Sequence, residues 1–98
     1  MSSERITRVQ RSGDGKWNYL KSDGSLLSEE WYADAWDFKE GFAVVQREDG
    51  KWNYLKTDGS LLSEEWYAAV SSFIEGLALV KREDGTWCEI DKNGKIIK

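Results

Sequence analysis

DGKWNYLK occupies residues 14–21, recurs unchanged at residues 49–56, and has a diverged third copy, DGTWCEID, at residues 84–91. The residues of WNYLK alternate between apolar and polar, as in a strand with one face against a core. The Asp-Gly pair before it is a strong signal for a hairpin, because type I′ turns need positive φ at both central residues. The stretch therefore predicts a β-hairpin that the chain repeats three times.

The repeat has a period of 35 residues. When residues 14–48 are aligned with residues 49–83, 26 of the 35 positions are identical. A fixed period of this kind is the mark of a repeat architecture. The 98 residues are therefore expected to form one repeat domain, with a half-repeat at 6–13, repeats at 14–48 and 49–83, and a half-repeat at 84–98.

Each hairpin is expected to belong to a longer β-meander. FAVVQR at 42–47 is rich in strand-forming residues, a turn and the WNYLK strand follow, and LLS after the next turn begins a third strand. Tight turns are predicted at the Asp-Gly and Asn-Gly pairs 14–15, 23–24, 49–50, 58–59, 84–85 and 93–94. The fold class is therefore all-β, with three β-meander units in a small closed or stacked antiparallel array. The connections 28–41 and 63–76 fit an extended return or one helical turn, because SEEW has the form of a capping box.

Comparison of the copies indicates which faces are buried. In the strand at 42–47, Phe42 and Val44 become Leu77 and Leu79 in the second copy while Ala43 and Val45 persist, so both faces stay apolar, which predicts a strand buried on both sides. Charges enter towards the two ends of the chain, where Arg8 replaces Val44 and Glu89 replaces Tyr54. Polar end units are expected in an open stack. The opposite charges of Arg8 and Glu89 would also allow the two ends to meet in a closed ring, and the half-repeats at both ends of the chain slightly favour this closure.

The composition argues against an enzyme. The chain has no histidine, which excludes Ser-His-Asp, Cys-His and zinc arrangements that depend on one. The single cysteine, Cys88, stands where the other copies have Asn and is interpreted as an unreactive strand residue. No calcium-binding loop accompanies the carboxylates of Glu29, Glu30, Asp34, Asp37 and Glu40. We expect no catalytic residues, no metal and no cofactor.

The charge pattern bears on partners and location. The net charge is −4, and the repeat 14–48 alone carries −4, so direct nucleic-acid binding through clustered Lys and Arg is not expected. The acidic repeat suits a basic protein partner, or else serves as a solvated surface. No apolar run approaches the roughly 18 residues of a membrane span, and no signal-like segment begins the sequence. We therefore expect a cytoplasmic protein that does not bind membranes.

DGKWNYLKTDG, followed by WY and by FIEGLALVKR at 73–82, resembles the bacterial WG-repeat family. The resemblance covers about 85 of the 98 residues and departs where the family has Gly after Trp, since Asn18, Asn53 and Cys88 stand there. It implies an all-β repeat used as a non-catalytic module. WNYLKSDGSLLSEEW more weakly resembles choline-binding-type cell-wall repeats, which implies binding of carbohydrate or cell wall.

The recurring tryptophans have two interpretations. Trp17, Trp52 and Trp87 occupy the same strand position in the three copies. Repeated aromatic faces at one position can stack on sugars, but they more often form the core that one meander buries against the next. Because Glu89 replaces a neighbouring Tyr at the end of the array, we favour the core interpretation.

The candidate binding site lies where the copies disagree. DAWD at 34–37 is replaced by AVSS at 69–72, so Trp36 is not required for the core of every repeat. The predicted binding residues are Trp31, Tyr32, Asp34, Trp36 and Asp37. Trp36 is expected to anchor in a partner's pocket while the aspartates steer a basic rim. The function expected is non-catalytic protein binding, with inhibition of a basic nucleic-acid-handling enzyme, carbohydrate binding and structural self-assembly as alternatives; near-identical repeats also suit a homo-oligomer or a strand-swapped dimer.

Overall fold

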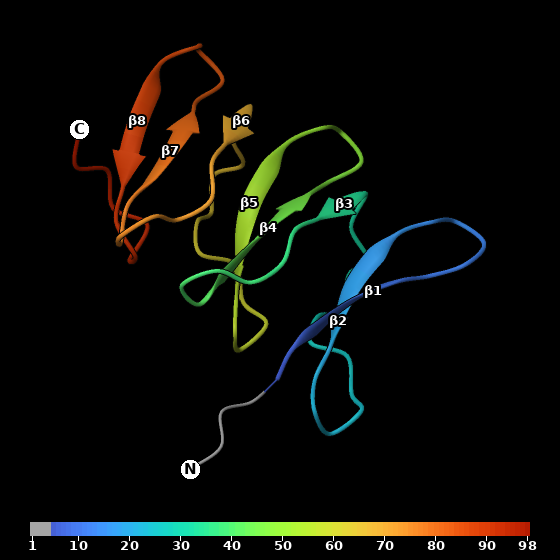
Figure 1. The fold of residues 1–98 in the computed structure, drawn as a ribbon. Coiled ribbons are helices and arrows are strands. Elements are labelled where there is room, and N and C mark those ends of the chain that lie inside the picture. Colours follow the sequence, from blue (N-terminus) through green and yellow to red (C-terminus); the bar gives the residue numbers. More distant parts are fainter. Residues whose placement is uncertain (1–4) are drawn as a thin grey trace.

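Eight short strands form three antiparallel sheets that follow one another along the chain (Figure 1). The computed structural model describes residues 5–98. The strands are β1 Thr7–Gln10, β2 Trp17–Leu20, β3 Asp34–Ala35, β4 Phe42–Gln46, β5 Trp52–Lys56, β6 Ala69–Val70, β7 Ala78–Lys81 and β8 Trp87–Ile90. The first sheet is β1-β2, the middle sheet β3-β4-β5 and the last sheet β6-β7-β8. The all-β prediction is confirmed, and no helix in residues 5–98 could cross a membrane.

The third strand of each larger sheet comes from before the hairpin and not from after it. Asp34–Ala35 pairs with β4 and Ala69–Val70 with β7, whereas the predicted LLS strand makes only a single bridge between Leu55 and Leu61. The chain runs back beside β2 as far as Tyr32, which bridges to Trp17, and at the next residue the Ala33 N–H donates to the carbonyl of Gln46 in the next sheet, at 2.8 Å. Each segment between sheets therefore links one hairpin to the next. We call residues 26–32 and 61–67 the return segments.

The turns differ from the predicted type. In the β4–β5 hairpin Arg47 pairs with Lys51, and the Gly50 N–H donates to the Arg47 carbonyl at 2.9 Å. This leaves a three-residue loop, one residue longer than a type I′ turn, and only its glycine has positive φ. The predicted type I′ geometry at Asp-Gly is therefore wrong. Positive φ at two consecutive residues occurs instead at Glu40-Gly41 and Glu75-Gly76, between the short strand and the hairpin.

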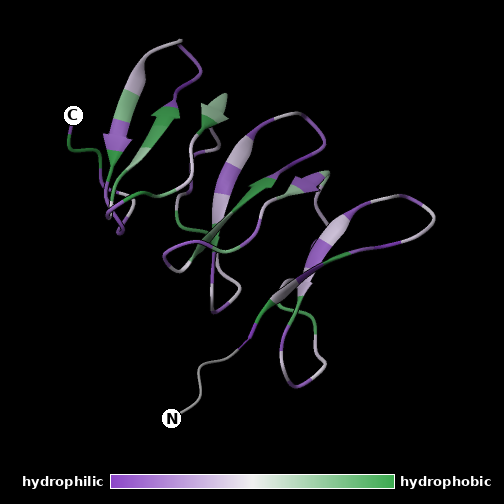
Figure 2. Cartoon of the chain, viewed as in Figure 1, coloured by the Kyte–Doolittle hydropathy of each residue, from purple (hydrophilic) through white to green (hydrophobic). Residues whose placement is uncertain are grey.

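The middle sheet is covered on both faces. Ala43, Val45 and Leu55 pack with Tyr19 of the first sheet, while Val44 and Tyr54 belong to the cluster shared with the last sheet. We call the face that each sheet turns towards the next sheet in the chain its front, and the opposite face its back. Figure 2 shows β4 as a hydrophobic strand, as this position requires. The two-sided burial predicted for the strand at 42–47 is confirmed for Ala43, Val44 and Val45.

The last sheet presents its front to the outside. Leu79, the equivalent of Val44, is 46% exposed, because no further sheet of the described chain covers it. The prediction of two-sided burial therefore fails for β7. Cys88 lies on the other face of this sheet, packed against the shared core cluster. Glu89 and Trp87 alternate with Cys88 along β8 and so belong to the front.

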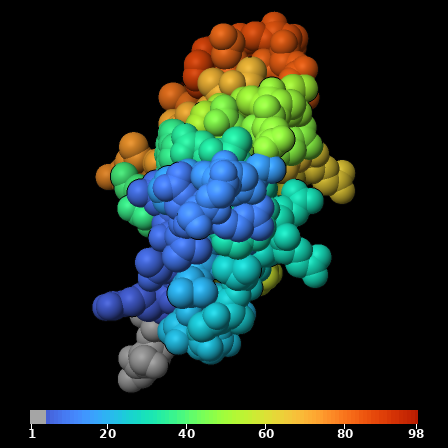
Figure 3. All heavy atoms as spheres, turned by 90° about the vertical axis from the view of Figure 1, so that its right-hand side faces the viewer, coloured from blue at the N-terminus to red at the C-terminus, as the bar shows by residue number. Residues whose placement is uncertain are grey.

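The stack is open and the two ends do not meet. The first and last sheets stand on opposite sides of the middle sheet (Figure 1), and Figure 3 looks onto the end formed by the first sheet. Arg8 faces inward: its Nη1 donates to the Ala35 carbonyl at 2.7 Å, and its guanidinium lies 4.6 Å from the centre of the Trp17 ring. The expectation that Arg8 marks an outer face, or meets Glu89, is therefore wrong. Arg8 replaces an apolar contact with a bond to the backbone of the next sheet.

Buried asparagines fix the return segments. The Asn53 Oδ1 accepts the Tyr54 N–H at 2.7 Å and its Nδ2 donates to the Ser63 carbonyl at 2.8 Å; Asn18 does the same for Tyr19 and Ser28. Neither Asn18 nor Asn53 has positive φ. The position where the WG-repeat pattern has Gly is therefore used here for a buried amide and not for a left-handed backbone.

Candidate functional site: a groove between the first two sheets

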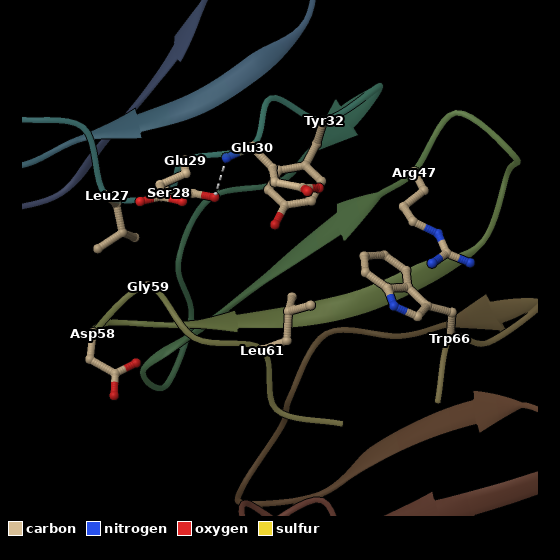
Figure 4. A pocket seen from close by; sticks show the side chains of 10 residues that line it. All are labelled: Leu27, Ser28, Glu29, Glu30, Tyr32, Arg47, Asp58, Gly59, Leu61 and Trp66. Atoms are coloured by element: carbon tan, nitrogen blue, oxygen red, sulfur yellow. Dashed lines mark hydrogen bonds between the residues drawn. The ribbon is translucent and has the colours of Figure 1, made fainter. Parts of the chain in front are cut away.

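A hollow with a volume of about 530 Å³ lies between the return segment 26–32 and residues 58–66, which follow β5 (Figure 4). It is lined by Leu27, Ser28, Glu29, Glu30, Tyr32, Arg47, Asp58, Gly59, Leu61 and Trp66. A second hollow of about 330 Å³ shares Glu30, Tyr32 and Arg47 with it and adds Lys16, Trp31, Glu48 and Asp49. Because of these shared residues we treat the two hollows as one groove, named below the acidic groove.

Backbone contacts hold the two walls of the groove in place. On one wall, the Ser28 Oγ accepts the Glu30 N–H at 3.0 Å, which bends the chain so that both glutamates line the hollow. On the other wall, the turn at Gly59 approaches the first return segment very closely. A Cβ placed on Gly59 would lie 2.5 Å from the Leu27 carbonyl oxygen, and φ of Gly59 is +88°. Only glycine allows this approach.

Aromatic rings line the groove beside arginines. The Arg47 guanidinium lies 4.2 Å from the centre of the Trp66 ring, and Arg11 lies 4.3 Å from the centre of the Trp31 ring. Tyr32 is buried in the core between the first two sheets, and burial raises the pKa of its hydroxyl. In Figure 4 the Tyr32 ring, Trp66 and Arg47 stand around the same hollow. The groove therefore offers flat apolar surfaces at which guanidinium groups already stack.

The groove carries a net negative charge. Its walls hold five carboxylates and two cations, a balance of −3: Glu29, Glu30, Glu48, Asp49 and Asp58 against Lys16 and Arg47. Lys16 pairs with Glu48 at 2.6 Å and Arg47 with Asp49 at 2.9 Å. The Ser60 hydroxyl and then its N–H bond the Asp58 carboxylate and lower its pKa. Within residues 5–98, Glu29 and Glu30 form no salt bridge, so these two are available to a ligand.

The five predicted binding residues do not form one site. Trp31 and Tyr32 line the acidic groove. Asp34 accepts the Ala35 N–H at 2.9 Å, and Trp36 packs on the core with its ring 5.5 Å from that of Trp52. Asp37 lines a separate hollow; its side chain is 82% exposed and lies 3.6 Å from Arg8. β3 runs between these two hollows, so Trp31 and Tyr32 at one end of the segment 31–37 lie away from Asp37 at the other end.

The recurring tryptophans also differ in their surroundings. Trp17 and Trp52 pack against the two core clusters, with Arg8 over the first ring and Trp36 against the second. Trp87, on the front of the last sheet, is 55% exposed. The core interpretation thus holds for Trp17 and Trp52, whereas Trp87 is largely exposed to solvent.

The residues that sequence reasoning missed come from both repeats. Arg47 closes the repeat 14–48, whereas Asp58 and Trp66 lie in the repeat 49–83, which differs little from the first, so nothing in its composition singles them out. One signal was present: an Arg precedes a Trp by about twenty positions at two places, at Arg11 and Trp31 and again at Arg47 and Trp66. That recurring pair is the stacked contact seen along the groove.

The groove is lined by carboxylates, cations and aromatic rings. No histidine is present, and residues 5–98 contain no set of three or more acidic or cysteine side chains placed to hold a metal. Comparison of the chain with protein-family models, with curated proteins and with solved structures returned no match. The WG-repeat resemblance therefore stays a prediction, and function has to be argued from the groove itself.

Proposed function

We propose that this protein is a non-catalytic binding module that takes a basic segment of a partner protein into the acidic groove. The observation that carries the proposal is the excess of five carboxylates over two cations around a hollow with aromatic walls. Lys and Arg side chains of a partner would pair with Glu29 and Glu30. Their aliphatic stems would cover the exposed parts of Trp31 and Trp66.

The strength of such contacts sets the kind of partner. An exposed ion pair contributes about 0.2–1 kcal/mol, so one Lys or Arg gives little affinity. A segment with several basic residues is needed, and its binding will weaken as salt screens the groove. A basic nucleic-acid-handling enzyme falls within this class of partner. Sugar stacking receives less support, since Arg8 and Trp36 already lie against the Trp17 and Trp52 rings.

The matched repeats provide a controlled test. Glu29 lines the groove, whereas Glu64, its equivalent 35 residues later, is exposed and does not line it. A Lys-rich peptide containing one Phe is titrated into ¹⁵N-labelled protein and compared with a Glu-rich peptide of equal length. We expect shifts at residues 28–32 and 47–49, a roughly fivefold loss of affinity for Glu29→Lys, and less than about twofold for Glu64→Lys.

Two results would contradict the proposal. One is an equal loss of affinity for Glu29→Lys and Glu64→Lys, which would mean that only net charge matters. The other is binding that is unchanged between about 0.05 and about 0.5 M NaCl, since contacts with the acidic groove are screened over that range.

A further inference from the structure

The front of the last sheet carries a hollow of about 250 Å³. It lies between β7, the turn at Glu75-Gly76 and the residues that follow β6. Its walls include Ser71, Ile74, Leu77, Leu79 and Glu89. Ile74 is 59% exposed and Leu79 is 46% exposed, so the hollow belongs to an apolar surface open to solvent.

The fronts of the other two sheets show what fills this position. On the first sheet, Phe38 of the next sheet packs edge-on against Tyr19, with ring centres 5.0 Å apart. On the middle sheet, Phe73 stacks on Phe42 at 4.5 Å and meets Tyr54 at 4.9 Å. A phenylalanine contributed by the following sheet therefore occupies both inner positions. The hollow on the last sheet has the same place in the repeat, beside Leu77 and Glu89.

The polar contact beside each phenylalanine is altered at the last sheet. Tyr19 donates its hydroxyl to the Trp36 carbonyl at 2.5 Å, and Tyr54 donates to the Ser71 carbonyl, in each case two residues before the Phe. Glu89 stands at the equivalent place and carries an acceptor instead of a donor. A further copy of this repeat would bring a carbonyl oxygen against the Glu89 carboxylate, which is repulsive.

A second contact of the inner interfaces is also missing there. Lys16 and Lys51 each reach forward to a glutamate of the next sheet, at 2.6 Å from Glu48 and 2.5 Å from Glu83. Thr86 replaces this lysine in the last hairpin. Two of the polar contacts that join one repeat to the next are thus absent, while the apolar hollow is kept.

We propose that this hollow binds an aromatic side chain of a partner protein, presented beside a Lys or Arg that pairs with Glu89. The aromatic ring would take the place that Phe38 and Phe73 take within the chain. A Lys or Arg two residues before the ring would bring a side-chain donor to the Glu89 carboxylate, which the backbone carbonyl at that position cannot supply. This site is separate from the acidic groove and does not depend on the function proposed for it.

Peptides based on the segment that carries Phe73, which fills this position on the middle sheet, test the proposal directly. AVSSFIEG, residues 69–76, carries Phe73 and presents the Ser71 carbonyl. Three peptides are titrated into ¹⁵N-labelled protein: this sequence, a form with Arg in place of its first Ser, and the Arg form with Ala in place of Phe. We expect the Arg form to shift β7 amides and to bind up to about fivefold more tightly than the unaltered peptide, and the Ala form not to bind.

Variants of the protein locate the contact. Leu79→Lys places a charge in the hollow and should abolish binding of the Arg peptide. Leu26→Lys, at a site on the first return segment that is 44% exposed, should leave it unchanged. Glu89→Gln should remove most of the preference for the Arg peptide while keeping the Phe contact. If Leu79→Lys changes the amide spectrum as a whole, that variant is misfolded, and the proposal is then tested by the effect of Glu89→Gln on the preference for the Arg peptide.

Three outcomes would overturn the proposal. The first is that no peptide shifts β7 amides at millimolar concentration. The second is that the unaltered peptide binds as tightly as the Arg form. The third is that the protein self-associates in light scattering and Leu79→Lys makes it monomeric, because the occupant would then be a second copy of this chain.

Discussion

A single buried amide at Asn53 decides the path of a whole return segment. Its side chain is fully buried and bonds both the Tyr54 N–H and the Ser63 carbonyl. A buried carbonyl that loses its donor keeps its desolvation penalty. The same amide at Asn18 holds Ser28, and Ser28 in turn orients Glu30 in the acidic groove. The position of Glu30 in the acidic groove therefore depends on the buried hydrogen bond between Asn18 and Ser28.

Replacing Asn53 by Ala is expected to lower the free energy of unfolding by about 2 kcal/mol, because it strands a buried N–H and a buried carbonyl. Urea denaturation followed by tryptophan fluorescence measures the change. Cys88→Ala is the control, since Cys88 holds the equivalent position in the last hairpin and should cost about 1 kcal/mol or less. Equal losses for the two variants would show that the amide contacts contribute nothing special.

Glu40 links the middle sheet to the last one in a pH-dependent way. Its carboxylate accepts the Gly76 N–H at 2.8 Å and the Glu75 N–H at 2.7 Å, and these bonds, that of Gly76 first, lower its pKa. A folded-state pKa below the unfolded value means that the carboxylate stabilises the fold above the unfolded pKa of about 4.3. That stabilisation is lost as the pH falls through the lower folded value.

Glu40→Gln should therefore lower the melting temperature at pH 7, and the gap to the unaltered protein should close as the pH drops below the folded pKa of Glu40. Thermal denaturation at a series of pH values measures this gap. Glu75→Gln, the same change in the equivalent turn of the last sheet, should have a smaller effect with little pH dependence. A gap for Glu40→Gln that stays constant down to pH 3 would rule the carboxylate out as its cause.

At the scale of the element, the hairpins follow from local sequence and the third strands do not. Apolar alternation and Gly spacing are properties of adjacent residues, so WNYLK and FAVVQ were predictable as paired strands. Whether LLS or the two residues Asp34–Ala35 complete a sheet depends on competition between two neighbouring sheets for the same connection. Local periodicity holds no information on that competition. The Asp-Gly turns were placed correctly but assigned the wrong geometry, because loop length follows from register.

Two glycines in equivalent kinds of turn separate backbone strain from close packing. Gly50 and Gly59 have φ of +89° and +88°, but a Cβ on Gly50 meets nothing within 4 Å, whereas one on Gly59 would lie 2.5 Å from the Leu27 carbonyl oxygen. Gly50→Ala should cost about 1–2 kcal/mol from strain alone. Gly59→Ala should cost clearly more, by about 2 kcal/mol, and should weaken peptide binding in the acidic groove. Equal losses in urea denaturation would mean that the two sheets are not in close contact there.

At the scale of the whole molecule, the repeat predicted the architecture better than the site. The all-β class followed from the repeated hairpin signals, and the burial of β4 followed from comparing the copies. The acidic groove did not, because it joins Glu30 of one repeat to Trp66 of the next, 36 positions away. The hollow beside Glu89 did not follow from the sequence either: the packing of Phe38 and Phe73 on the two inner sheets is what indicates that a ring suits this position.

The hollow on the last sheet depends on the open stack, in which only the middle sheet is covered on two faces. Native-state hydrogen exchange by NMR measures this most directly, because local opening is harder where both faces are buried. We predict that hydrogen-bonded amides of β4 and β5 exchange at least about tenfold more slowly than those of β1–β2 and β7–β8. Equal protection of all three hairpins would contradict the account, since that is the result expected of a ring whose ends close on each other.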